Sequence, residues 1–220
     1  MQKFDTPAPI AAVLDVPAGR VQLIAADRTD TAVEVRPVNA AKGRDVKAAE
    51  RTTVEFADGV LRVRAAAGNQ YFGSSGSVEV TVQLPAGSRV EATAASAEFR
   101  AVGRLGDVAL DAAHGKIKLD ETAGARLATT AGDIEIGRLG GAAQISTAQG
   151  DIRIAQAMGG TVVLHTQDGD ISVDAAPGVS ASLDAGTAHG RITNSLKNDG
   201  TAGLNIHATT SHGDITARSR

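Results

Sequence analysis

The sequence predicts an all-β protein, most of which is a β-solenoid (a β-helix-like fold), a stack of short coils built from strands. Two observations support this prediction. A triplet of Gly, a polar residue and Ile recurs at intervals of 17 to 23 residues, and apolar residues alternate with polar or small ones around each copy. Such alternation is typical of strands with one buried face. A period this short leaves no room for a helix in each repeat.

The composition fits this fold and argues against several functions. Hydrophobic residues make up 42% of the 220 residues and charged residues 21%, as in a globular chain. Aromatic residues make up only 2%, and the net charge is −3. The chain therefore lacks the stacking platforms and the basic surface that nucleic-acid-binding proteins use, and we expect no nucleic-acid partner. The absence of Cys excludes disulfides and thiolate metal sites.

Residues 1–90 are predicted to form an irregular β part with hairpins that caps the solenoid, in one continuous unit with it. Strands are expected at residues 12–16, 21–25, 32–36, 52–56, 60–64 and 78–84. Asp58-Gly59, between two alternating runs, predicts a tight hairpin. Residues 42–51 are either a loop or a short helix, and the Gly/Ser-rich residues 71–77 predict a loop.

Residues 91–220 are predicted to be the solenoid repeats. The triplets are Gly115-Lys116-Ile117, Gly132-Asp133-Ile134, Gly150-Asp151-Ile152, Gly169-Asp170-Ile171, Gly190-Arg191-Ile192 and Gly213-Asp214-Ile215, with a degenerate copy at Ala97-Glu98-Phe99. Stacking the coils in sequence order predicts one buried column formed by the six triplet isoleucines. A second predicted column contains Leu110, Leu127, Ile145, Leu164, Leu183 and Ile206.

The repeat resembles a known protein family. Gly-Asp-Ile-x-Ile, together with the strand end Leu84-Pro85-Ala86-Gly87, is similar to the bacterial β-strand-repeat family of candidate adhesins, otherwise described as a domain of unknown function. The resemblance covers nearly the whole chain and implies a β-solenoid and an adhesin role. It implies no catalytic residues. Ala97-Glu98 departs from the family pattern.

Two sets of residues are weak candidates for metal ligands. Asp133, Asp151 and Asp170 should stack on consecutive coils, where a calcium ion would relieve their repulsion. Alternatively, these carboxylates accept hydrogen bonds from backbone amides of the turns. His189 and His212 would ligate zinc, but with Asp168 they make three ligands, and structural zinc takes four. We therefore expect no metal and no cofactor.

No constellation of residues predicts an enzyme. A nucleophile beside a His, a Gly-x-Ser-x-Gly elbow and a phosphate-binding glycine loop are all missing from the sequence. The alternative is a carbohydrate-active enzyme, a lyase or a glycosidase, because two carboxylates on adjacent coils of a β-helix would suit acid–base chemistry.

We therefore predict a protein that binds another protein or itself. The last coil, with the triplet at Gly213, is expected to form an exposed C-terminal edge, and a homodimer through that edge is the simplest self-association. No signal peptide or membrane-spanning segment is visible, so a cytoplasmic location is expected; the alternative is the cell surface after removal of an upstream segment.

Overall fold

A computed structural model describes residues 1–65 and 76–220, so residues 71–75 of the predicted loop lie outside the described residues. The chain divides into two compact units, residues 1–115 and 116–220, each described here by itself. The first unit contains the strands β1 (Gln2–Asp5), β2 (Ala11–Asp15), β3 (Ala18–Ala26), β4 (Asp30–Pro37), β5 (Thr53–Ala57), β6 (Val60–Arg64), β7 (Val78–Pro85) and β8 (Arg89–His114), and the helix α1 (Gly43–Glu50).

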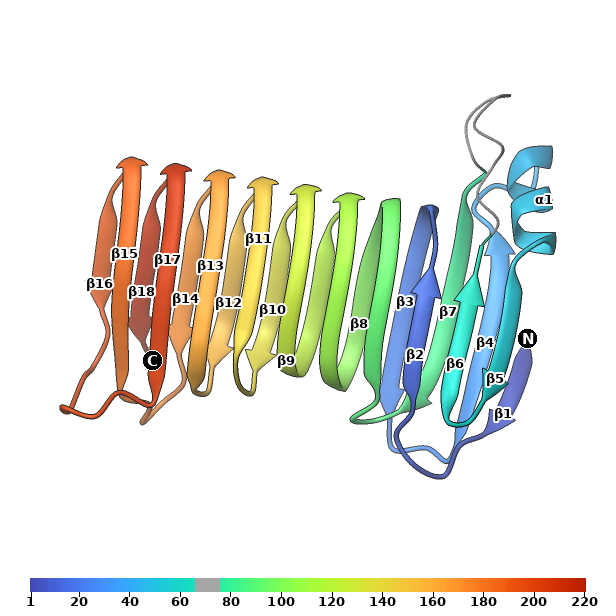
Figure 1. Ribbon diagram of the computed structural model, residues 1–220, viewed down its shortest axis with the longest axis horizontal. Coiled ribbons are helices and arrows are strands. Elements are labelled where there is room, and N and C mark those ends of the chain that lie inside the picture. The colour runs from blue at the N-terminus through green and yellow to red at the C-terminus, as the bar shows by residue number, and fades with distance from the viewer. Residues whose placement is uncertain (66–75) are drawn as a thin grey trace. The chain divides into compact units, whose positions relative to one another are not determined.

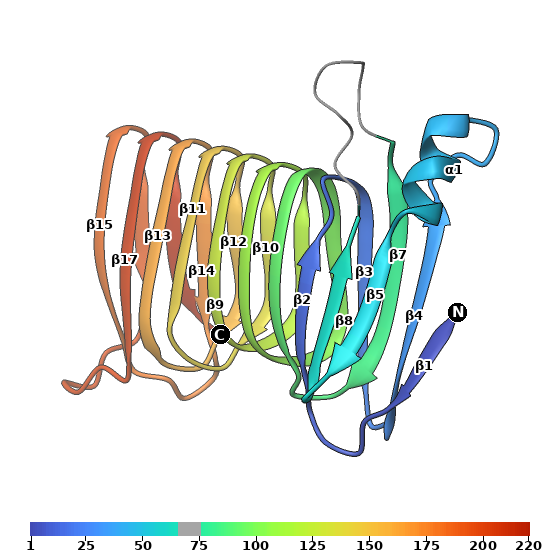
Figure 2. The ribbon, with the colours of Figure 1, turned by 45° about the vertical axis from the view of Figure 1, so that its right-hand side comes forward.

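Parallel strand pairs form the centre of the first unit. Strand β2 lies between β6 and the start of β8, and β3 lies between β7 and the next part of β8 (Figure 2). Strand β4 pairs antiparallel with both β1 and β7. The six strands predicted for this part are confirmed as β2 to β7, and residues 42–51 contain a helix, α1. Strand β1 was not expected, because its sequence QKFD carries a single apolar residue.

The predicted hairpin is confirmed at Asp58-Gly59. Strands β5 and β6 are antiparallel, with Ala57 opposite Val60. Asp58 has φ 51° and Gly59 has φ 73°. Positive φ at both central residues is the geometry of a two-residue type I′ turn, which matches the twist of the strands it joins.

The second unit is built from parallel strands in two ladders (Figure 1). Its strands are β9 (Ile117–Ala131), β10 (Ile134–Leu139), β11 (Ala143–Gln149), β12 (Ile152–Ala157), β13 (Gly160–Asp168), β14 (Ile171–Ala175), β15 (Ala181–His189), β16 (Ile192–Ser195), β17 (Leu204–His212) and β18 (Ile215–Ser219). The Ile ladder runs from the start of β9 through β10, β12, β14 and β18 to β16. The Thr ladder runs from the end of β9 through β11, β13 and β17 to β15.

A rung is one strand of the Thr ladder together with the strand of the Ile ladder that follows it in the chain. Each triplet is the corner between the two strands of a rung. The predicted Ile column is confirmed for Ile117, Ile134, Ile152, Ile171 and Ile215, which lie in register and are at most 1% exposed. Alternating apolar residues therefore fill the space between the two ladders, as the sequence pattern predicts.

Ile192 differs from the prediction of a buried column. It is in register with Ile215 but is 45% exposed. The reason is the order of the rungs. The final rung in sequence, β17–β18, lies between β13–β14 and β15–β16, so β15–β16 ends the row (Figure 1). The expectation that the rung with the triplet at Gly213 forms the C-terminal edge is therefore wrong.

The second predicted column is also wrong at its C-terminal members. Ile145 lies between Leu127 and Leu164 as expected. Ile206, however, is opposite Val162 and Leu183, while Leu164 is opposite Ala208. The displacement is two residues, which keeps the same side chains on the buried face. The alternation of the sequence cannot distinguish registers that differ by two.

Candidate functional site

The corners of the second unit bring together most of the residues that the sequence singled out. At each corner a glycine allows two rungs to approach closely. Gly150 has φ 137°, and a Cβ there would lie 2.4 Å from the carbonyl oxygen of Gly132 on the neighbouring rung. Gly169, Gly190 and Gly213 repeat both features. Only glycine fits a corner with this backbone conformation and this contact.

A threonine precedes the corner glycine by three residues on these rungs; Thr147, Thr166 and Thr210 are buried, and Thr187 on the terminal rung is half-buried. The Thr166 hydroxyl donates a hydrogen bond to the Gly150 carbonyl of the neighbouring rung, at 3.1 Å. Thr147, Thr187 and Thr210 make the equivalent bond to their neighbouring rungs. The carbonyl group that lies closest to the corner glycine of the neighbouring rung thus accepts a hydrogen bond from a threonine hydroxyl. This column was not predicted from the sequence, where its signal is the constant spacing Thr-x-x-Gly.

The corner aspartates form a second series of bonds between rungs. The backbone N–H of Asp151 donates to Asp133 Oδ1 at 3.1 Å, and that of Asp170 donates to Asp151 Oδ1 at 2.8 Å. The series continues from Asp214 to Asp170 at 2.7 Å and from Arg191 to Asp214 at 2.8 Å. Each carboxylate therefore accepts a backbone hydrogen bond from the adjacent rung. From the sequence, backbone amides of the turns were the alternative to calcium, and the donors are indeed turn amides, but of the neighbouring rung.

Arg191 ends the aspartate series at the terminal rung. No amide of a further rung lies beyond it in the described part of this unit, so a carboxylate at this position would have no such donor to accept. The Arg191 guanidinium instead forms an ion pair with Asp214 at 3.0 Å. The Arg191 backbone N–H and then its guanidinium hold the pKa of Asp214 below its usual range. The change from Asp to Arg thus marks the end of the row.

The expectation that no metal binds remains a prediction. One oxygen of each predicted calcium ligand, Asp133, Asp151 and Asp170, is occupied by a backbone amide. Within residues 1–65 and 76–220, no three Asp, Glu or His side chains are arranged as a group that would hold a metal ion.

The predicted zinc ligands lie together, as expected. His189 and His212 are in register on adjacent rungs, with ring centroids 4.8 Å apart and an interplanar angle of 8°. His212 Nδ1 lies 3.1 Å from Asp168 Oδ1 on the next rung. Because the rings are stacked in nearly parallel planes, their lone pairs do not converge on one point between them. The arrangement is an exposed stack that ends on a carboxylate.

The outward face of the Ile ladder carries paired charges. Glu135 contacts Lys116 at 2.8 Å and Lys118 at 3.0 Å. These two lysines hold the pKa of Glu135 below its usual range. A glycosidase acid needs a carboxyl group whose pKa is raised. Glu135, which lines a shallow depression of about 330 Å3 beside Asp120, is therefore unsuited to that role.

An ion-pair cluster around one buried carboxylate holds the inserted rung in place. Asp174 in β14 is only 2% exposed, and it contacts Arg218 at 2.7 Å and Arg220 at 2.8 Å. Burial raises the pKa of Asp174, but the hydrogen bonds from the two guanidinium groups outweigh this effect, and the pKa is lowered. The cluster fixes the end of β18 against β14.

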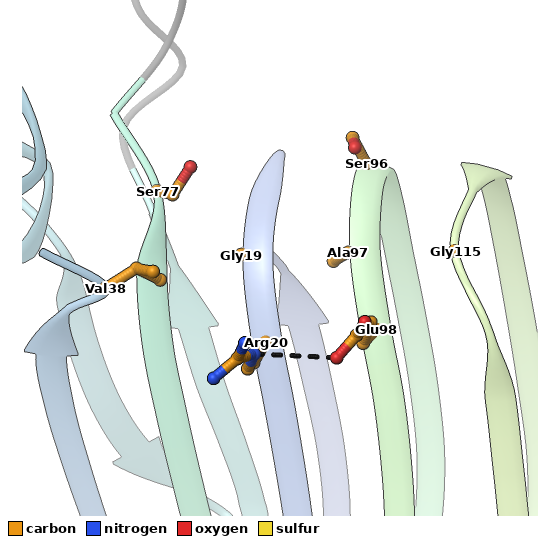
Figure 3. Close-up of a pocket in the computed structure, with 8 residues that line it drawn as sticks. All are labelled: Gly19, Arg20, Val38, Ser77, Ser96, Ala97, Glu98 and Gly115. Carbon is orange, nitrogen blue, oxygen red and sulfur yellow. Dashed lines mark ion pairs between the residues drawn. The ribbon is translucent and has the colours of Figure 1, made fainter.

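A shallow groove of about 360 Å3 lies in the first unit (Figure 3). It is lined by the corner residues Gly19, Ala97 and Gly115 and by the ends of neighbouring strands. One ion pair, Arg20 to Glu98 at 3.5 Å, crosses it, and both side chains are more than 60% exposed. The degenerate triplet Ala97-Glu98 thus contributes a solvated ion pair here.

The sequence matches a known family over almost its full length. The family model described as Toastrack DUF4097 matches residues 13–219. The chain belongs to the Toastrack (DUF4097) family. This confirms the resemblance found in the sequence, since the Toastrack fold is solenoid-like and the family is a domain of unknown function.

Solved structures share the Toastrack fold at low sequence identity. A candidate adhesin from Bacteroides fragilis is 13% identical with a TM-score of 0.60, and a candidate lipid-binding protein from Parabacteroides distasonis is 13% identical with a TM-score of 0.55. In both cases the match covers 98% of this chain and 95% of the other. At this identity the similarity shows the fold alone. A search of curated proteins finds no significant match.

Over the part of the chain that the structure describes, no helix has the length and apolar character needed to cross a membrane.

Proposed function

We propose that this Toastrack protein is a non-enzymatic, adhesin-like binding protein that acts through protein–protein contacts or self-association. The observation that supports this most is the use of the repeat residues. The Thr hydroxyls and Asp carboxylates of the corners are engaged in hydrogen bonds between rungs. What remains for function is the outer surface and the terminal rung.

The outer surface favours a protein partner over a sugar. The outward positions of the Thr ladder carry small or polar residues such as Ser146, Thr209 and Gly186, and also Val163, which is 40% exposed. Sugar sites usually stack on the rings of Trp, Tyr or Phe, and none of these positions carries one of those residues. The adhesin description of the Bacteroides fragilis structure agrees with a binding role.

We infer also that the 17- to 23-residue sequence repeat is the coil of the solenoid. Ile117, Ile134, Ile152 and Ile171 lie in successive register at steps of 17, 18 and 19 residues, and Ile192 and Ile215 are in register at a step of 23. The 21-residue step from Ile171 to Ile192 does not join neighbouring rungs, since Ile171 is in register with Ile215.

Affinity capture from extract of the native cells, with the full chain as bait, tests the binding function. A protein retained at stoichiometric amounts would support it, and a heat-unfolded bait is the control. Turnover of any substrate in a broad panel of polysaccharides and glycosides would contradict the non-enzymatic assignment.

A further inference from the structure

The terminal rung of the second unit leaves two strand edges open. Strand β15 pairs with β17 and β16 pairs with β18, and Figure 1 shows β15 and β16 as the last strands of the row. Edge strands present unpaired N–H and C=O groups that readily pair with another chain.

The backbone of β15 directs donors to this open side. The Ser180 carbonyl accepts a hydrogen bond from the N–H of Leu204, the first residue of β17, whereas the Ala181 N–H donates to the Lys197 carbonyl of the loop that follows β16. Because successive residues of a strand direct their backbone groups to opposite edges, we expect Leu183 and Ala185 to present their N–H groups to the open side. The loop thus closes only the start of the edge.

The edge also lacks the protection that natural edge strands usually have. Strand β16 (Ile192–Ser195, ITNS) carries no charge, and β15 (ASLDAGTAH) has neither Lys nor Pro. Its one acidic side chain, Asp184, lies on the outward face and contacts His207 of the inner rung at 3.3 Å. Lys, Pro or an inward charge on an edge would prevent pairing with another chain.

Apolar surface accompanies the open backbone. Ile192 is 45% exposed, whereas Ile215, in register on the inner rung, is 1% exposed. Leu183 is half-buried, although its inner neighbour Ile206 is buried. The difference arises because an inner rung is covered on both sides. A further layer would bury Leu183 and Ile192.

We propose that a second copy of this chain supplies that layer, by antiparallel pairing of β15 with β15 about a two-fold axis. This proposal rests on the proposed binding function and names its partner. Pairing centred on Ala185 places Asp184 opposite Gly186 of the second copy, so like charges are not directly opposite.

The Arg191 corners favour this antiparallel orientation, because it keeps the two like charges apart and places each beside a loop that carries Asp199 as well as Lys197. Arg191 lies at the corner between β15 and β16 and is 87% exposed. At the other end of β15, the Asp199 N–H donates to Ser180 Oγ, so the Asp199 loop lies beside the start of that strand. The two-fold pairing brings Arg191 of one copy to the Asp199 loop of the other. Pairing of β15 with β16 across the copies would place the two Arg191 corners together.

Light scattering after size exclusion, with the full chain at 1–100 µM (about a hundredfold concentration range), tests the proposal. The expected species at high concentration has twice the monomer mass of 22.3 kDa. Ile192→Lys adds a charge at the edge and should weaken the dimer by at least about tenfold. Val163→Lys is the matched control. Val163 is 40% exposed but lies on the outward face of β13, away from the open edge, so the Val163→Lys variant should dimerise as the wild type does.

A monomer throughout the concentration range would overturn the proposal but would leave binding to a different protein intact, because affinity capture tests that function independently. A dimer that survives Ile192→Lys, or one dissociated by Val163→Lys, would place the interface elsewhere and overturn it. Growth into filaments would also contradict a closed two-fold pair.

Discussion

The close approach of neighbouring rungs at the corner glycines can be tested by three Gly→Ala substitutions. Gly186 has an ordinary φ and nothing within 4 Å of its hypothetical Cβ; Gly178 has φ 80° and also nothing within 4 Å. Gly150 has φ 137°, and its Cβ would lie 2.4 Å from the Gly132 oxygen and 2.6 Å from the Gly132 carbon. The series therefore separates backbone strain from collision.

The expected losses follow from these differences. Gly186→Ala should change the free energy of unfolding by no more than about 0.5 kcal/mol. Gly178→Ala should cost about 1–2 kcal/mol for the positive φ. Gly150→Ala should cost about 1–2 kcal/mol for its positive φ, as at Gly178, and about 1–3 kcal/mol more for overpacking. Its total loss should therefore be about 2–5 kcal/mol. The contact atoms are backbone of the next rung, which cannot move without breaking ladder hydrogen bonds.

Urea unfolding followed by circular dichroism measures the three losses, since the chain has no Trp to report by fluorescence. The reasoning is refuted if Gly150→Ala and Gly178→Ala unfold at the same urea concentration with the same slope. That result would mean that adjacent rungs do not approach at the corner as closely as the structure shows.

Three further predictions follow from the second unit. Ile152→Asp, at a residue 1% exposed, should prevent folding, whereas Ile192→Asp in the same column should give a soluble fold with unchanged circular dichroism; equal behaviour of the two would contradict the rung order. Thr166→Val should cost about 1 kcal/mol by removing the hydroxyl bond to the Gly150 carbonyl, and an unchanged urea midpoint would show that this bond contributes nothing. Asp174→Asn should cost about 1–3 kcal/mol, since Arg218 and Arg220 are half-exposed and stay hydrated. Because the pKa of Asp174 is lowered in the fold, its contribution is present above about pH 4 and is lost as the pH falls through the folded-state pKa, so the variant and wild type should converge in acid; a constant difference down to pH 2 would refute this.

Much of the fold could be predicted because alternation and glycine spacing report local geometry. The strands β2 to β7, the hairpin at Asp58-Gly59 and the buried isoleucines all follow from patterns within a few residues. The rung order could not be predicted in this way, because Ile192 and Ile215 fit the column equally well in either place. Arg191 alone was not a sufficient signal, because Lys116 also replaces the corner aspartate and a rung still follows it in register.

The candidate site residues were found in part. The aspartates and the histidine pair were identified by their repetition, and the structure brings each set together. Their partners were missed because each donor or acceptor belongs to another rung, at separations from 18 to 44 residues. The burial of Thr166 was missed because the alternating pattern does not distinguish a Thr at a buried position from a Thr at an exposed one.

The order of the terminal rungs is the claim on which the open edge and the proposed dimer depend, and cysteine pairs test it most directly. The chain has no Cys of its own, so any intramolecular disulfide must join the two introduced cysteines. Ser172 in β14 is in register with Thr216 in β18, and Thr216 is in register with Thr193 in β16. Neighbouring strands lie about 4.8 Å apart, and residues two strands apart are separated by about 10 Å. Ser172→Cys with Thr216→Cys should form an intramolecular disulfide on oxidation, and Ser172→Cys with Thr193→Cys should not. The opposite result, a disulfide between positions 172 and 193 but not between 172 and 216, would place the rungs in sequence order and contradict the account.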